Sequence, residues 1–185
     1  MLNIFKWIKN KRKISHDFKE DESGRAIIDL TINDKTEVLS PFVIDKKETI
    51  NAEFASFLDN AVKPIPPKKK IHIDVTCKGI SETDKTIFGR AIKNYYYNTC
   101  QESMRKLENN MKIFFVMCAL SVLTLVLLFL VSFFDCYWLI VEVVDIVVWV
   151  FVWEAVDLLA FQRSMLLYEK YRNLSLYDCL ITFNS

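Results

Sequence analysis

Glycine, proline, histidine and paired cysteines are scarce in this chain of 185 residues. It has 3 glycines, 4 prolines and 2 histidines, and its 5 cysteines form no CxxC pair. The sequence therefore lacks a phosphate-cradling glycine loop, an HExxH helix and a Ser-His-Asp set, and it shows no zinc-binding spacing and no disulfide framework. We expect no enzyme activity, no metal site and no cofactor.

Excess charge of either sign is also missing. The 24 lysines and arginines balance 23 acidic residues, so no whole-protein field attracts nucleic acid. Three consecutive tyrosines, residues 95–97, follow Lys93 closely, but an aromatic triplet without a basic surface favours packing over base stacking. We expect no nucleic-acid partner.

Long apolar runs are what the chain has instead. Residues 113–134 contain no charge, and at about 1.5 Å of rise per residue they form a helix of roughly 33 Å, enough to cross a hydrocarbon core of about 30 Å. A second apolar run covers residues 137–158 and is long enough to cross back. Residues 111–161 are thus predicted to form a transmembrane helical hairpin.

Basic residues flank both predicted spans at the ends away from the connecting turn. Arg105, Lys106 and Lys112 precede the first span, whereas the connecting turn carries only Asp135. Arg163, Lys170 and Arg172 follow the second span. Positively charged flanks stay on the cytoplasmic side, so we expect a multi-pass protein of the cell membrane with both termini in the cytoplasm and the lipid bilayer as its surroundings.

The first 24 residues form a basic segment without a continuous apolar stretch, so they are not a secretory signal. Residues 2–8 include several large apolar side chains and residues 6–13 several basic ones. Two interpretations stay open: an amphipathic helix lying on anionic lipid, or a frayed basic terminus.

Four carboxylates interrupt the second run at different depths. Glu154 and Asp157 fall near the inner interface, where charge is tolerated, and Asp157 lies level with Lys112, which predicts an ion pair between them. Glu142 and Asp145 fall deeper, where an ionised acid costs roughly 2.5–3.5 kcal/mol. We expect another group to offset this cost.

A helical wheel collects the polar and aromatic residues of the second run on one face. That face contains Glu142, Asp145, Trp149, Trp153 and Asp157. The opposite face contains Val144, Val147, Val148, Phe151, Ala155 and Leu158. We expect the apolar face to meet acyl chains and the acidic face to point into protein, because unpaired polar groups avoid lipid.

Within a single hairpin, the first span offers Glu142 and Asp145 only the hydroxyls of Ser121, Thr124 and Ser132. Three remedies remain: protonated acids that hydrogen-bond between packed helices, a ring of acids in an oligomer, or a second membrane protein that supplies Lys or Arg. We favour a homo-oligomer, and thus an integral membrane interaction or signalling module. The alternative is an oligomeric pore or proton-conducting protein that uses the two acids.

The remaining sequence predicts a small cytoplasmic α+β domain into which the hairpin is inserted. Residues 26–33 and 71–77 alternate apolar and polar side chains, as half-buried strands do, and residues 177–183 predict a terminal strand. Helices are expected after Asn51, after Ser81 and beyond the second span. We expect residues 162–185 to pack on residues 25–110, with all three strands in one sheet.

Overall fold

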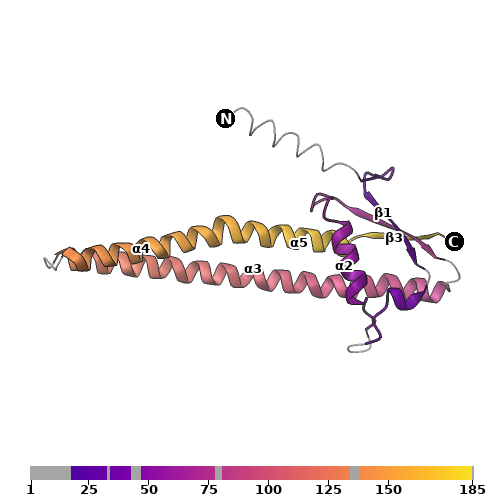
Figure 1. Ribbon diagram of the computed structural model, residues 1–185, viewed down its shortest axis with the longest axis horizontal. Coiled ribbons are helices and arrows are strands. Elements are labelled where there is room, and N and C mark those ends of the chain that lie inside the picture. Colours follow the sequence, from indigo (N-terminus) through magenta and orange to yellow (C-terminus); the bar gives the residue numbers. More distant parts are fainter. Residues whose placement is uncertain (1–17, 33, 43–46, 78–80, 134–137, 185) are drawn as a thin grey trace. The chain divides into compact units, whose positions relative to one another are not determined.

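A computed structural model describes residues 18–32, 34–42, 47–77, 81–133 and 138–184 of the chain (Figure 1). The first 17 residues of the predicted basic segment, and Asp135 in the predicted turn, lie outside the described residues. The elements are β1 (Ala26–Ile32), the 3-10 helix η1 (Lys35–Glu37), α2 (Ala52–Ala61), β2 (Ile71–Cys77), α3 (Glu82–Phe133), α4 (Trp138–Asp157), the π-helix η2 (Leu158–Gln162), α5 (Arg163–Tyr177) and β3 (Leu180–Asn184). They divide into one unit of Met1–Gln101 with Lys170–Ser185 and a second unit of Glu102–Glu169.

The first unit contains one three-stranded sheet in the order β1-β2-β3. Ile28 lies opposite Ile73 in the first pair of strands, and Ile73 lies opposite Ile181 in the second. The prediction that the terminal strand joins the two earlier strands is confirmed. Both pairs are parallel, so each connection is a crossover, as in α/β folds. The first crossover contains α2, and the second contains α3, α4 and α5.

One face of this sheet is buried under helices. The alternating apolar residues of β1 and β2 are buried as predicted, and Ile73 at the centre is 0% exposed. They form one core with Leu58 of α2, Phe88 and Ile92 of α3, and Leu176 of α5. Such a half-covered sheet explains the clean alternation of apolar and polar residues in the sequence.

Local signals set the starts of α2 and α3. The backbone N–H of Phe54 donates to the Asn51 side chain at 2.6 Å, which caps α2 as predicted. Ser81 accepts the backbone N–H of Asp84 at 3.3 Å and so caps α3. The helix then continues without a break through Asn110 to Phe133.

The other face of the sheet carries a hydrogen-bonded polar network. The hydroxyl of Thr182 donates to Asp74 at 3.1 Å, and the Asn184 amide donates to both Asp74 oxygens at 2.8 and 2.9 Å. His72 Nε2 lies 2.9 Å from the same Thr182 hydroxyl, and its Nδ1 lies 3.3 Å from Asp21. His72 is therefore half-buried, because both of its ring nitrogens lie against polar side chains of this network.

The carboxyl of Asp21 is held in its charged form at the edge of this network. The backbone N–H of Arg25 donates to it at 2.8 Å and that of Ser23 at 2.9 Å. The hydrogen bond from Arg25 is the main reason why the pKa of Asp21 lies below its ordinary value. The bond from Ser23 and the nearby His72 lower this pKa further.

The terminal strand begins later than the sequence predicts. Helix α5 continues to Tyr177, and the backbone N–H of Asp178 still donates to Leu174 at 2.9 Å. Leu176 is fully buried in the core, which keeps this last turn helical. The expected start at Tyr177 is therefore wrong, and β3 starts at Leu180.

Replacing Ile73 with alanine should loosen the sheet, because it removes a fully buried side chain from the central strand. We expect the opening free energy of the β2 amides to fall by about 2–5 kcal/mol, measured by hydrogen exchange on the full chain. Thr76→Ala on the same strand is the control, since Thr76 is exposed. Equal losses in the two variants would contradict the buried face described above.

Candidate functional site

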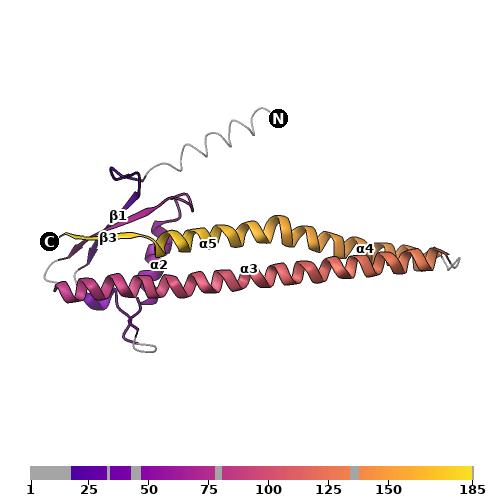
Figure 2. The same ribbon diagram turned by 180° about the vertical axis from the view of Figure 1, so that it is seen from behind.

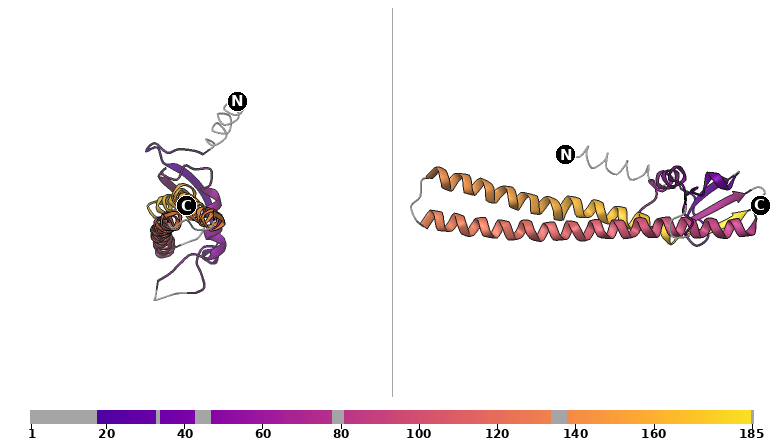
Figure 3. Two further views of the ribbon diagram at one scale, coloured as in Figure 1. Left: turned by 90° about the vertical axis from the view of Figure 1, so that its left-hand side faces the viewer. Right: turned by 90° about the horizontal axis from the view of Figure 1, so that it is seen from below.

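The second unit is a pair of antiparallel helices. Figures 1, 2 and 3 all show the later part of α3 and α4 running side by side in opposite directions. Among the described residues, one helix, α3, is long and apolar enough to cross a membrane by length and composition. Helix α4 has 20 residues, but every 18-residue stretch of it contains Glu142, Asp145 and Glu154. The expectation of two spans is thus met for α3 alone.

Small side chains lie where the two helices face each other. Ser121 of α3 is 8% exposed and Ala155 of α4 is 7% exposed, and both line a hollow of about 340 Å³ between the helices. Cys118 lines the same hollow. Small residues at such positions let two helix backbones approach closely in a membrane.

The apolar face of α4 is therefore the face that meets α3. Val148 is 8% exposed and Leu158 is 3% exposed, and with Ala155 they follow the three-and-four spacing of a two-helix seam. The prediction that the apolar face meets lipid is wrong within the single chain for these three residues, whereas Val147 of the same face is 38% exposed. A helical wheel separates two faces, but it does not say which face the neighbouring helix covers.

The other face of α4 is largely exposed. It contains Glu142, Asp145, Trp149 and Trp153, which we call the acid-tryptophan face. Trp149 and Trp153 are each 65% exposed, and both carboxylates are exposed. In the described part of the chain, none of the four side chains has a hydrogen-bond or ion-pair partner. The described part of the chain therefore leaves most of this face exposed.

Only part of the predicted hydroxyl support reaches the acids. Ser132 of α3 lines a hollow of about 340 Å³ together with Glu142 and Asp145. Ser121 donates to the carbonyl of Met117 at 2.8 Å instead. Thr124 likewise donates within its own helix, at 2.9 Å to the Leu120 carbonyl.

The predicted pair of Lys112 and Asp157 is not brought together. Asp157 accepts the Gln162 amide at 2.8 Å, and no ion pair joins it to Lys112 in the described residues. The π-helix η2 follows at once and inserts an extra residue into the helical spacing.

An ion pair that was not predicted joins α3 to α5. Lys106 lies 3.0 Å from Glu102 on its own helix and 3.6 Å from Glu169 of α5. The hydrogen bond to Glu102 is the main reason why the pKa of Lys106 rises above its ordinary value. Sequence analysis missed this pair because no local spacing relates Lys106 to Glu169.

Among the described residues, no group of three or more His, Cys, Asp or Glu side chains is placed to hold a metal ion. Comparisons with models of protein families, with curated proteins and with solved structures find no match for this chain.

A thiol placed at Ala155 should cross-link to the native Cys118, because both positions line one hollow. The test uses a short bis-maleimide on full-length protein in lipid, with Cys77, Cys100, Cys136 and Cys179 replaced by serine. We expect Ala155→Cys to give an intrachain product in severalfold higher yield than Trp153→Cys on the opposite face. Equal yields would show that α4 is rotated from the described orientation.

Proposed function

We propose that this chain is a two-pass membrane protein that assembles with further copies of itself through the acid-tryptophan face of α4. Both termini lie in the cytoplasm, and the first unit is the cytoplasmic part that the assembly brings together. The hairpin thus serves an interaction or signalling module rather than an enzyme.

The pairing of β2 with β3 carries the two-pass proposal. These strands lie before and after the apolar helices in the chain, yet they share one sheet. Residues of one sheet lie on one side of a bilayer, so the chain between them crosses an even number of times. If α3 crosses, a return crossing follows, and α4 is the apolar helix of suitable length among the described residues, at roughly 30 Å.

Exposure of the helix surfaces also supports insertion. Phe115, Leu123 and Phe129 of α3 are between 64% and 69% exposed, and Val143 and Ile146 of α4 are about as exposed. Contiguous apolar surface of this extent is rare on a water-soluble monomer. Acyl chains cover such a surface without cost.

In a bilayer, Glu142 and Asp145 are the groups that need a polar partner from protein. An ionised acid near the middle of a bilayer costs roughly 2.5–3.5 kcal/mol, and the hairpin offers these two carboxylates no basic residue. The sequence contains no Lys or Arg between Lys112 and Arg163. Protein from outside the chain therefore has to cover the face.

A second copy suits this face because the face carries both partners of a hydrogen bond. The indole N–H groups of Trp149 and Trp153 only donate, and ionised carboxylates only accept. In a parallel symmetric pair, equivalent residues lie at equal depth, so the acids of one copy meet the acids and indoles of the other.

Replacing both tryptophans with phenylalanine tests the assembly, since it removes the two donors and keeps the rings. We expect Trp149→Phe with Trp153→Phe to weaken self-association about 5- to 30-fold, corresponding to roughly 1–2 kcal/mol. Energy transfer between labelled copies in vesicles, diluted with lipid, measures this change. Glu154→Gln is the control, because Glu154 lies outside the acid-tryptophan face. An unchanged association in the double variant would refute the proposed interface.

Amide substitution separates assembly from conduction. Glu142→Gln with Asp145→Asn keeps acceptors for the indoles, so association should persist near its original strength. Proton flux into vesicles is measured on the same samples. A flux that the original chain supports and the amide variant loses would favour the pore.

Reporters fused to the two ends test the topology. Two crossings predict that both fusions are active in the cytoplasm and that neither is reached by an impermeant reagent from outside. Reporters on opposite sides would mean that α3 alone crosses, and the two-pass proposal would fail.

A further inference from the structure

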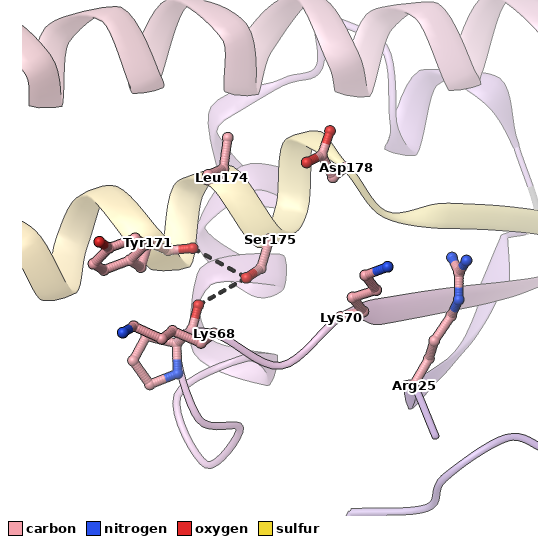
Figure 4. Close-up of a pocket in the computed structure, with 8 residues that line it drawn as sticks. Arg25, Lys68, Lys70, Tyr171, Leu174, Ser175 and Asp178 are labelled. Carbon is pink, nitrogen blue, oxygen red and sulfur yellow. Dashed lines mark hydrogen bonds between the residues drawn. The ribbon is translucent and has the colours of Figure 1, made fainter. Parts of the chain in front are cut away.

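A basic hollow lies in the first unit. It has a volume of about 480 Å³, within the range of sites for small molecules. Figure 4 shows its lining side chains, which come from the residues just before β1, from the loop that leads into β2, and from the last turns of α5. The lining residues are Arg25, Pro67, Lys68, Lys70, Tyr171, Leu174, Ser175 and Asp178.

Three cations of this hollow lack ion pairs. In the described part of the chain, no carboxylate lies within 4.0 Å of Arg25, Lys68 or Lys70. The neighbouring Lys69, in contrast, lies 3.0 Å from Glu20. Asp178 is the single acid on the lining, so the hollow keeps a positive charge of about two.

The acceptors at the end of α5 do not neutralise these cations, because they are uncharged carbonyl and hydroxyl groups that hydrogen-bond within the protein. The Ser175 hydroxyl donates to the carbonyls of Pro67 at 2.8 Å and Tyr171 at 3.0 Å, as Figure 4 shows. The carbonyl of Leu174 accepts the backbone N–H of Asp178 at 2.9 Å. The charged ends of Arg25 and Lys70 are left for a ligand.

The hollow also has an aromatic wall. The Lys68 ammonium lies 5.0 Å from the centre of the Tyr171 ring, which holds this cation against the lining. Leu174 adds apolar surface beside the ring. An anionic group attached to an organic molecule fits the cations and the apolar wall together better than an inorganic ion does.

We propose that this hollow binds a phosphate ester of a polyhydroxylated small molecule. Arg25 and Lys70 contact the phosphate oxygens, because a guanidinium fork and an ammonium suit a doubly charged group with several acceptors. Asp178 accepts hydrogen bonds from the ligand's hydroxyl groups. The same chemistry occurs in free sugar or inositol phosphates and in phosphorylated inositol lipids.

The test uses the full chain in nanodiscs of neutral phosphatidylcholine, titrated with soluble inositol trisphosphate in a calorimeter. We expect one site, weakened roughly tenfold or more by Arg25→Gln and by Lys70→Gln, since each removes one charge-assisted contact. Lys69→Gln is the matched control and should leave the affinity within about twofold. Hydrogen exchange of the β1 and β2 amides verifies that each variant keeps its sheet.

A second arm distinguishes the source of the phosphate. Nanodiscs that contain a phosphatidylinositol bisphosphate are analysed by native mass spectrometry for lipid retained on the protein. Retention that depends on Arg25 and Lys70, without binding of the soluble compound, supports the site with a lipid as its ligand. Absence of binding in both arms, or equal losses in Lys69→Gln and Lys70→Gln, would overturn the proposal.

Discussion

The parallel pairing of β3 with β2 is the constraint on which the rest of the structure depends. It joins the last strand of the chain to a strand that precedes every apolar helix. The chain that leaves through α3 must therefore return through α4 and α5 before the sheet is complete. Because parallel neighbours cannot be joined by a tight turn, a long crossover is required, and here the apolar helices occupy it. The hairpin is in this sense a very long crossover connection.

The two faces of α4 have different roles: one packs against α3, and the other carries the acids. Val148, Ala155 and Leu158 are buried within the hairpin, and Ser121 provides a small side chain on α3. Glu142 and Asp145 lie on the exposed face and have no hydrogen-bond or ion-pair partner among the described residues. A helix that served only as an anchor would have no need of these acids, so their position connects the packing of one chain with the proposed assembly of several.

Much of the fold could be predicted because it follows from local periodicity. The alternation around Ile28 and Ile73, the cap at Asn51 and the start of α3 after Ser81 all appear as expected. The candidate site was predicted less well. Its residues share one face of a helix, and Ser132 lines a hollow with Glu142 and Asp145, but the residues of α4 that are buried are Val148 and Ala155 of the opposite face. Periodicity alone does not tell which face of a helix its neighbour covers.

The linear chain alone establishes the apolar runs, the alternating strands and the set of residues that share the face of Glu142, because these depend on neighbours a few positions apart. The tertiary structure decides that the sheet is parallel, that His72 lies against Thr182, and that α4 meets α3 through its valines. It also brings Arg25 and Lys70 to one hollow with Tyr171. These outcomes depend on which surfaces bury the most apolar area together, and that quantity is defined only once distant segments are packed.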